Sequence, residues 1–343
     1  MSKIKCAIIG MGVGEKHLEA IKKSKIAEIV AICDFKESKI KYLKKKYPRI
    51  KIFNNAKDIF DLKELDVVSI ASYDKFHFEH VMSAYKKKIN FVVEKPICST
   101  LNQLKKINNY NNKSKINFTS NFVLRQNDLF KKIKKKLSTK SIYYIEADYL
   151  WGRKQKLFGW RSKDKNYSII SGGAIHMIDL INWFLGSLPI EVFTMTNKNL
   201  TYNSKFKKDS FCIINLKYKN NIIVKITMNS SCIHNHFHEL KIFQKKSTIM
   251  HNIKGTYEIK KKNNQFVTKN IIGKYPDKGN RKKLIINFLK TLKFKEKNHF
   301  HEKYIINLMN VCFAAEKSII EGKIQKIKYL FFKILVITLS PQK

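Results

Sequence analysis

The stretch that decides the fold is KIKCAIIGMGVGEKH, residues 3–17. Its apolar run from Ile4 to Ile9 has the composition of a buried strand, and the run ends at three closely spaced glycines, Gly10, Gly12 and Gly14. A helix-compatible segment then follows over residues 15–23. A buried strand that turns through glycine into a helix predicts the start of a parallel α/β sheet.

The same alternation continues over the first 120 residues. Short runs rich in Val and Ile, typical of strands, are separated by amphipathic segments of helical length. This pattern predicts an α/β fold, a doubly wound parallel Rossmann sheet with right-handed crossovers. The further strands are expected at 28–33, 51–53, 67–71, 91–93 and 116–120, and the further helices at 37–46, 57–60, 76–87 and 101–111.

The rhythm changes after about residue 121. We expect helices at 128–137, 174–185, 281–292 and 302–321, a long strand at 141–150, and several strands between 190 and 260. Residues 260–279 are polar and are expected to form a loop. These segments predict a C-terminal α+β domain with an open, mostly antiparallel sheet.

The expected segmentation is therefore 1–122 for the first domain, 123–328 for the second, and 329–343 for an apolar C-terminal tail. The tail is too short to span a bilayer, which needs about 20 apolar residues. It is interpreted as an appended terminus or a strand packed on the body, with a membrane-surface anchor as the alternative. No transmembrane segment is expected.

The charge of the chain requires a nucleic-acid interpretation to be considered. The chain has 343 residues, with 69 Lys and Arg against 26 Asp and Glu, a net charge of +43. Only five of the cations are arginine, the usual residue for bidentate recognition of bases and phosphates. The lysines are spread along the chain, and abundant Asn and Ile indicate AT-rich codons. We therefore expect no specific nucleic-acid partner; attraction to anionic substrates or membrane surfaces stays as an alternative.

Cysteine use indicates the compartment. The six cysteines lie far apart, contain no C-x-x-C pair, and several sit in apolar runs. They predict buried, reduced thiols rather than a disulfide or zinc framework. Because no signal pattern precedes the first strand, a cytoplasmic protein is expected.

The glycine turn has a candidate acidic partner. The standard dinucleotide fingerprint is G-x-G-x-x-G, and here the third glycine comes one residue early. Asp34 ends the second strand, 24 residues after Gly10, where a ribose-binding acid is expected. A carboxylate there favours NAD over NADP, although Lys36 and Lys39 leave NADP open. The alternative is an ordinary strand-to-helix turn in which Asp34 caps a helix.

Several further motifs occur together in one order. They are DVVSIASYDKFHFEHVMSAYKKK (66–88), FVVEKPI (91–97), NFVLR (121–125), GWR (159–161), SGGAIHMID (171–179) and AAEKSIIEGKIQKI (314–327). In these motifs the chain resembles the glucose–fructose oxidoreductase/inositol dehydrogenase family (Gfo/Idh/MocA) over about residues 3–328. The shortened glycine motif followed by His17 also looks like a variant within that family, which favours a true cofactor site.

The resemblance implies an NAD(P)-dependent oxidoreductase. Its substrate would be a sugar, an inositol-like polyol or a nucleotide-linked sugar, and its open sheet would pack against another subunit in a homodimer or homotetramer. Two alternatives stay open: a non-enzymatic NAD-binding protein, and an enzyme that uses bound NAD to cleave glycosides.

The resemblance also assigns catalytic roles. Lys95, directly after a parallel strand, would bind the substrate oxygen and stabilise a developing alkoxide. His176 and Asp179 stand three residues apart on a predicted helix and therefore share a face. Histidine titrates near neutrality and is suited to take the alcohol proton, while Asp179 would orient it or bind a sugar hydroxyl. Many members of the family carry an acid four residues before this histidine, where this chain has Gly172.

The remaining candidates each have a purely structural alternative. Ser72 and His77 would line the nicotinamide ribose, Glu94 and Asn121 would lie near the nicotinamide ring, Trp160 and Arg161 would contact cofactor or substrate, and Arg125 would meet an anionic group. His234, His236 and His238 alternate on a predicted strand and would face one way. Because no Cys or carboxylate pattern accompanies them, no metal is expected.

Overall fold

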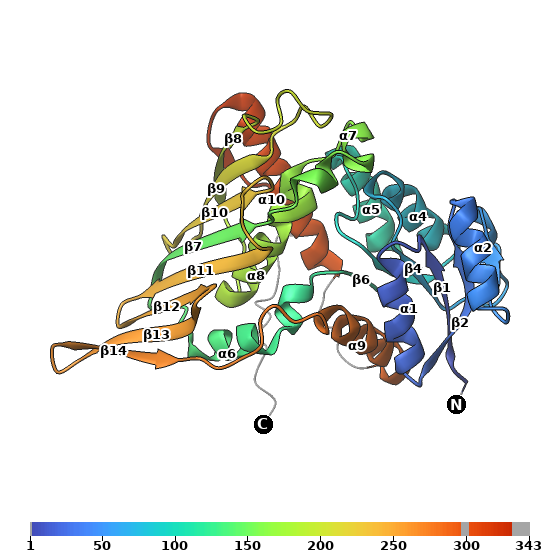
Figure 1. Cartoon of the computed structure of the whole chain (residues 1–343), viewed down its shortest axis with the longest axis horizontal. Coiled ribbons are helices and arrows are strands. Elements are labelled where there is room, and N and C mark those ends of the chain that lie inside the picture. The colour runs from blue at the N-terminus through green and yellow to red at the C-terminus, as the bar shows by residue number, and fades with distance from the viewer. Residues whose placement is uncertain (1, 296–301, 331–343) are drawn as a thin grey trace. The chain divides into compact units, whose positions relative to one another are not determined.

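The computed structural model describes residues 2–295 and 302–330, which fall into two compact units (Figure 1). The first unit contains the chain up to residue 123 and the described part of 278–306. The second contains 124–277 and the described residues from 307 onward. The contiguous segmentation expected from the sequence does not include this return of 278–306 to the first unit.

The first unit is built on a six-stranded sheet in the order β3-β2-β1-β4-β5-β6, with every strand pair parallel. This order confirms the predicted doubly wound sheet, in which ligands bind outside the carboxyl ends of the strands where the strand order reverses. That point lies between β1 and β4. The strands are β1 (Ile4–Ile9), β2 (Ala27–Cys33), β3 (Lys51–Phe53), β4 (Val67–Ile70), β5 (Asn90–Val93) and β6 (Phe118–Ser120).

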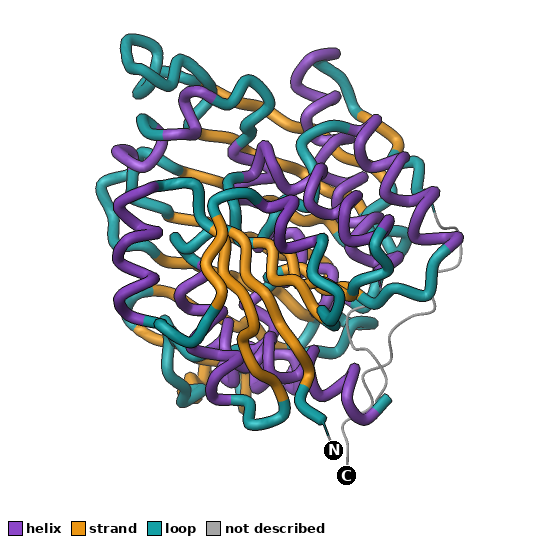
Figure 2. Tube along the Cα trace, turned by 90° about the vertical axis from the view of Figure 1, so that its right-hand side faces the viewer, coloured by secondary structure: helices purple, strands orange, loops and turns teal. Residues whose placement is uncertain are grey.

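Helices separate these strands along the chain, as the alternating pattern predicts (Figure 2). They are α1 (Gly14–Lys23), α2 (Glu37–Lys46), α3 (Ala56–Phe60), α4 (Asp74–Lys86), α5 (Leu101–Lys113) and, from the returning segment, α9 (Asn280–Phe294). Helix α9 packs on α1, so a segment far along the chain becomes part of the first unit.

The second unit contains a nine-stranded open sheet in the order β14-β13-β12-β11-β7-β10-β9-β8-β15. Only β10 and β7 pair in parallel, which confirms the predicted mostly antiparallel sheet. The strands are β7 (Ile142–Leu150), β8 (Glu191–Asn197), β9 (Phe211–Lys217), β10 (Ile223–Asn229), β11 (Phe237–Gln244), β12 (Ser247–Asn252), β13 (Gly255–Lys262), β14 (Gln265–Asn270) and β15 (Gln325–Lys326).

One face of this sheet is buried and the other is partly exposed. In β7, Ile145 and Ala147 are buried, whereas Tyr144, Glu146 and Asp148 between and beside them are half-buried. The period of two follows from the pleat of a strand. The helical segments of this part of the chain are η1 (Val123–Gln126), α6 (Asp128–Lys136), η2 (Lys154–Leu157), α7 (Trp160–Lys163), η3 (Ile170–Ala174), α8 (Ile175–Leu185) and α10 (Glu302–Glu321).

The expectation of a loop over residues 260–279 is wrong for its first half. Strands β13 and β14 form an antiparallel hairpin around Asn263 and Asn264, which both have positive φ, +46° and +61°. Two residues with positive φ make the turn that matches the twist of a hairpin, and Asn tolerates that conformation well. Every side chain of β14 is exposed, so backbone pairing forms this strand without the apolar alternation that would have predicted it.

The chain beyond the last helix begins to pack on the sheet. Strand β15 pairs with β8, and the Tyr329 hydroxyl donates to the Pro189 carbonyl. Of the predicted tail, residues 331–343 lie outside the described residues. Within residues 2–295 and 302–330, no helix is long and apolar enough to cross a membrane.

Candidate functional site

The three glycines after β1 have three different environments. Gly10 has φ +88°, and a Cβ there would lie 2.5 Å from the Ala71 carbonyl oxygen at the end of β4. A Cβ on Gly14 would lie 3.0 Å from Ile8 Cγ2, so glycine lets α1 pack closely on β1. Gly12 is exposed, and nothing lies within 4 Å of its Cβ position. The backbone at Gly12 is therefore open to a large ligand.

The start of α1 has unsatisfied donors beside this opening. No side chain caps the helix at Val13. The first N–H groups of a helix lack intrahelical partners and carry the positive end of the helix dipole, which suits an anion such as a pyrophosphate. The shortened motif therefore keeps the features that a dinucleotide needs: a tight turn, an approachable backbone and a free helix N-terminus.

Asp34 is buried at the end of β2 and closes the glycine turn. Its Oδ2 accepts a hydrogen bond from the Met11 N–H at 2.8 Å, and its Oδ1 accepts from the Lys36 N–H at 3.0 Å. Each carboxylate oxygen has a second lone pair available for a ribose hydroxyl. Lys39, which left NADP open at the sequence level, pairs with Glu15 at 2.6 Å.

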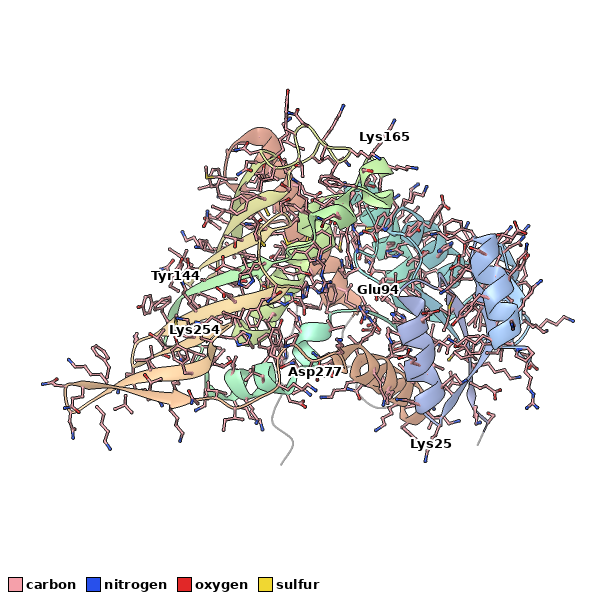
Figure 3. The ribbon with its side chains drawn as sticks, viewed as in Figure 1. Lys25, Glu94, Tyr144, Lys165, Lys254 and Asp277 are labelled. Carbon is pink, nitrogen blue, oxygen red and sulfur yellow. The ribbon has the colours of Figure 1, made fainter. Side chains whose placement is uncertain are left out.

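Glu94, the residue before Lys95, is the centre of a buried network of hydrogen bonds and ion pairs. Its Oε1 lies 3.1 Å from His17 Nε2 and 3.3 Å from Arg281 Nε, and it accepts a hydrogen bond from Asn121 Nδ2. Burial alone would raise the pKa of Glu94, but His17, Arg281 and Lys95 hold it well below the usual carboxyl range. Glu94, labelled in Figure 3, is thus an ionised anchor for the strand end that carries Lys95.

His17 contacts a partner at each of its ring nitrogens. An ionised carboxylate only accepts hydrogen bonds, so the proton facing Glu94 belongs to His17 Nε2. The Ser69 hydroxyl oxygen lies 2.7 Å from the other ring nitrogen, Nδ1. The histidine of the shortened glycine motif therefore connects α1, β4 and the end of β5.

His77 and Ser72, predicted to line the nicotinamide ribose, both make hydrogen bonds within the first unit. His77 is fully buried, with Nδ1 2.6 Å from the Pro96 carbonyl oxygen and Nε2 3.0 Å from the Ser72 carbonyl oxygen. Both ring nitrogens are thus occupied by backbone, and the ring ties the loop after β4 to the Glu-Lys-Pro loop, where the Lys95–Pro96 bond is cis. The Ser72 hydroxyl lies 3.1 Å from His80 Nδ1.

In the second unit, His176 lies in the first turn of α8, directly after the π-helical segment η3. Such segments are frequent at functional sites. The His176 ring lies edge-on to that of Tyr149, with centroids 6.3 Å apart. Tyr149 Oη is 3.0 Å from His236 Nε2, and its ring stacks on His238 at 4.2 Å. We call Tyr149, His176, His236 and His238 the histidine–tyrosine cluster.

Burial keeps two members of this cluster neutral. It lowers the pKa of His236 to about 4, with the charge of Arg153 adding to the effect. It also lowers the pKa of His238 well below its ordinary value, with help from His236 and His176. Near pH 7 these imidazoles are uncharged hydrogen-bonding groups.

Asp179, predicted to orient His176 or bind a sugar hydroxyl, and Arg125, predicted to meet an anionic group, bind each other. Asp179 is fully buried, and its carboxylate binds the Arg125 guanidinium, with Nε 2.8 Å from Oδ2 and Nη2 2.5 Å from Oδ1. The anionic group that Arg125 meets is therefore Asp179 itself. This two-point pair ties η1 to α8 and fixes the helix that carries His176.

The space beside Gly172 is filled by Tyr167. A Cβ at position 172 would lie 2.8 Å from Tyr167 Oη and 2.9 Å from Cζ and Cε2. A half-buried acid also lies nearby: Glu316 of α10 hydrogen-bonds Ser168 and Ser171, and partial burial raises its pKa to about 7. The turn before His176 is thus bordered by a phenol and a carboxyl group from other parts of the chain.

Trp160 and Arg161 lie together in α7. The Arg161 guanidinium carbon is 4.3 Å from the centroid of the Trp160 ring, and 5.6 Å from those of Trp151 and Tyr167. Arg153, two residues after Trp151, was not singled out by the sequence interpretation. Its charge acts on Tyr149, His236 and His238.

The predicted placement of three alternating histidines on a strand is wrong for His234 and His236. Strand β11 begins at Phe237, and half-buried His234 lies in the preceding loop with Nδ1 2.7 Å from the Asn235 carbonyl oxygen. His236 and His238 do lie together, with ring centroids 5.1 Å apart. Across the described ranges, no group of three or more His, Cys, Asp or Glu side chains is arranged to hold a metal ion.

Comparison with protein families identifies both parts of the chain. Residues 4–122 match the model of an oxidoreductase family with an NAD-binding Rossmann fold, and residues 134–324 match the C-terminal alpha/beta domain of the same family. The chain belongs to the Gfo/Idh/MocA oxidoreductase family. This confirms the resemblance, the fold class and NAD as the class of cofactor.

Individual Gfo/Idh/MocA relatives are more distant. D-glucoside 3-dehydrogenase of Escherichia coli is 28% identical over 202 residues, 54% of this chain and 55% of its own length. Myo-inositol 2-dehydrogenase of Thermotoga maritima is 24% identical over 201 residues, 55% of this chain and 57% of its own length. The chain thus spans about half the length of these curated relatives.

A solved structure supports the fold over a longer range. Myo-inositol 2-dehydrogenase from Lactobacillus plantarum superposes with a TM-score of 0.79 at 19% identity, covering 95% of this chain and 100% of that one. At this identity the likeness shows the Gfo/Idh/MocA fold alone.

Sequence reasoning missed the residues that act through tertiary contacts. Tyr149 and Glu316 lie within an ordinary strand and an ordinary helix, and no local pattern distinguishes them. Arg153 carried a signal that was available, since it is one of only five arginines among 69 cations.

Proposed function

We propose that this chain is an NAD-dependent oxidoreductase that transfers hydride between the nicotinamide and a secondary hydroxyl of a sugar, an inositol-like polyol or a nucleotide-linked sugar. The observation that carries the proposal is the open backbone at Gly12, closed on one side by the Asp34 carboxylate. The names of the two curated relatives, a glucoside and an inositol dehydrogenase, support the class of substrate.

In this proposal the first unit binds the cofactor. The turn at Gly10, Gly12 and Gly14 and the start of α1 hold the pyrophosphate, and Asp34 binds the adenosine ribose and disfavours a 2′-phosphate. When bound, NAD supplies the hydride acceptor or donor. Ser72, His77, Glu94 and Asn121 keep the loops around the nicotinamide in place through their internal hydrogen bonds.

Lys95 of the first unit and His176 of the second unit are the proposed catalytic residues. Half-buried Lys95, at the carboxyl end of β5, binds the reacting oxygen and stabilises negative charge on it. His176 takes the hydroxyl proton as a general base. Asp179 and Arg125 are positioning residues, because their side chains are occupied by each other, while Trp160 and Arg161 contact the substrate.

We also propose that the chain assembles as a homodimer or homotetramer through the exposed face of the nine-stranded sheet. Tyr144 and Phe243 stack there with ring centroids 5.6 Å apart, beside an exposed Ile223. In the next row Glu146 pairs with both Lys225 and Lys241. A second copy related by a two-fold axis would bury this apolar row, and its own ion pairs would lie against those of Glu146.

A cytoplasmic location is part of the same proposal. All six cysteines are free thiols, and five of them are buried. Free thiols in this number fit a reducing compartment.

The test is a fluorescence titration of the purified chain with NADH and with NADPH. We expect NADH to bind more tightly, and Asp34→Ala to weaken NADH binding or narrow the difference between the two cofactors. Lys95→Ala should keep most of the affinity for NADH while losing turnover on sugars and polyols. Binding of neither cofactor would refute the proposal; NADH binding without turnover on any sugar or polyol would favour the non-enzymatic alternative.

A further inference from the structure

Three of the cations between β7 and η3 are Arg153, Lys156 and Arg161. The two arginines both lie close enough to Lys156 to act on its ammonium. Burial, Arg153 and Arg161 together lower the pKa of Lys156. Arg153 and Arg161 both act on the Tyr149 phenol. Because like charges repel, three neighbouring cations are favourable only if a negatively charged group offsets their repulsion.

The Arg161 guanidinium is held in a defined orientation. Trp160, Trp151 and Tyr167 surround it with aromatic rings, all within the range of cation–π contact. Its Nη1 donates to the Lys156 carbonyl oxygen at 3.1 Å. Its Nε is buried and has no hydrogen-bond partner among the residues that the structure describes. A rigid guanidinium with donors to spare is suited to bind a planar or tetrahedral oxyanion.

No carboxylate of the described chain neutralises this group. Arg125 pairs with Asp179 and Arg281 pairs with Glu94. In residues 2–295 and 302–330, by contrast, neither Arg153 nor Arg161 forms an ion pair.

The carboxyl group of the same segment has other contacts. Asp164 is buried, its Oδ1 accepts a hydrogen bond from the Asn166 N–H at 3.0 Å, and its charge acts on Lys208. The cation cluster at Arg153, Lys156 and Arg161 is therefore left without its counter-ion.

Two tyrosines, Tyr149 and Tyr167, connect the cation cluster at Arg153, Lys156 and Arg161 to His176. Tyr149, on which both arginines act, lies edge-on to the His176 ring. Tyr167, whose ring Arg161 covers, fills the space beside Gly172, one helical turn before His176. Any anion held by the arginines is thus part of the surroundings of the proposed general base.

We propose that the missing counter-ion belongs to the substrate: the sugar or polyol that reacts beside His176 carries an oxyanion, a carboxylate or a phosphate, which binds Arg161 and Arg153. Lys156 adds charge without a fixed geometry. The position of this subsite relative to the reaction rests on the proposed function, but anion binding by the arginines does not. The substrate class is then a sugar acid or a phosphorylated sugar, and a neutral polyol is a poor ligand.

Direct binding tests this without turnover. The full chain, free of NAD, is titrated with D-glucuronate, inorganic phosphate and D-glucose, by calorimetry and by tryptophan emission, since two of the three tryptophans contact Arg161. We expect at least one of the two anions to bind, to change the emission, and to bind at least about ten-fold tighter than glucose. Arg161→Gln and Arg153→Gln should each weaken that anion about ten-fold, and about 0.5 M NaCl should weaken it too.

The control is Lys165→Gln, which removes an exposed cation of the same loop (Figure 3) and should leave anion binding unchanged. Tighter binding of glucuronate than of phosphate indicates that the anionic group of the substrate is a carboxylate. Tighter binding of phosphate indicates that it is a phosphate. If no anion binds, or if Lys165→Gln weakens binding as much as Arg161→Gln, the subsite is refuted.

The two proposals fail in different ways. If anions bind in a way that depends on the arginines, but NAD is not reduced with any sugar, the proposed oxidoreductase activity is refuted and the proposed anion subsite stands. If neutral sugars are oxidised as fast as sugar acids and sugar phosphates, the anion subsite is refuted and the proposed oxidoreductase activity stands.

Discussion

Replacing Gly172 by Ala tests whether Tyr167 has taken the space that a side chain at position 172 would need. In the native chain the new Cβ would lie 2.8–2.9 Å from three atoms of the Tyr167 phenol ring. Carbon atoms do not approach that closely, so the ring must move. It is held on two sides, edge-on to Trp160 and to Phe206, each with centroids 5.8 Å apart.

The sign of the effect depends on which of two opposing terms is larger. Ala instead of Gly in a helical segment stabilises by roughly 0.5–1 kcal/mol, because it restricts the unfolded chain. Overpacking a buried site costs roughly 1–3 kcal/mol. We therefore expect Gly172→Ala to destabilise the second unit by about 1–2 kcal/mol, which lowers its Tm by roughly 2–8 °C for a unit of this size.

In a Tyr167→Leu background the steric term disappears and the sign should reverse. Gly172→Ala should then raise Tm by about 1–3 °C relative to Tyr167→Leu alone. Thermal unfolding followed by circular dichroism measures all four proteins, with Gly12→Ala, whose Cβ meets nothing within 4 Å, as a control. Equal effects of Gly172→Ala in both backgrounds would refute the argument. The same clash implies that Gly172→Asp alone does not supply an acid near His176.

Two further outcomes follow from ionisable groups of the second unit. The pKa of Glu316 is raised from 4.5 to about 7 in the folded chain, so the folded state binds the proton more tightly and stability falls as pH rises through that interval, by about 3 kcal/mol in all. Glu316→Gln should flatten the dependence of Tm on pH between these values, and an unchanged slope would contradict the assignment. Breaking the buried pair by Arg125→Gln or Asp179→Asn should each cost about 3–5 kcal/mol in denaturant unfolding. The double variant should cost less than their sum, and strict additivity would argue against the pair.

The fold of the first unit could be predicted because local signals agree with one another. The run Ile4–Ile9, the glycines and the later Val- and Ile-rich strands all indicate parallel strands joined by helices, and strand order follows from that topology. The packing of α9 on α1 could not be predicted. The apolar face of a helix shows that it packs against something, but not against which other helix. The β13–β14 hairpin was missed because two asparagines and backbone pairing formed it without an apolar pattern.

The candidate site was predictable only where a residue acts close to its own motif. Gly12 and Asp34 lie where the fingerprint puts them. His77 was predicted to contact the ribose and Asp179 to orient His176 or bind a sugar hydroxyl, but spacing along a helix does not show which protein groups lie opposite them. His77 faces the backbone carbonyls of Ser72 and Pro96, and Asp179 faces Arg125; Pro96 and Arg125 belong to other segments of the chain.

The arginines show where a fixed geometry is needed in a chain whose cations are otherwise lysines. A lysine ammonium provides a mobile point charge, whereas a guanidinium provides donors in a fixed plane. Arg281 and Arg125 each neutralise a buried carboxylate, Glu94 behind Lys95 and Asp179 below His176. In each unit, an arginine–carboxylate pair therefore positions the residue proposed to act on substrate. Arg161 has the same fixed geometry without a carboxylate, and that difference is what assigns its partner to the substrate.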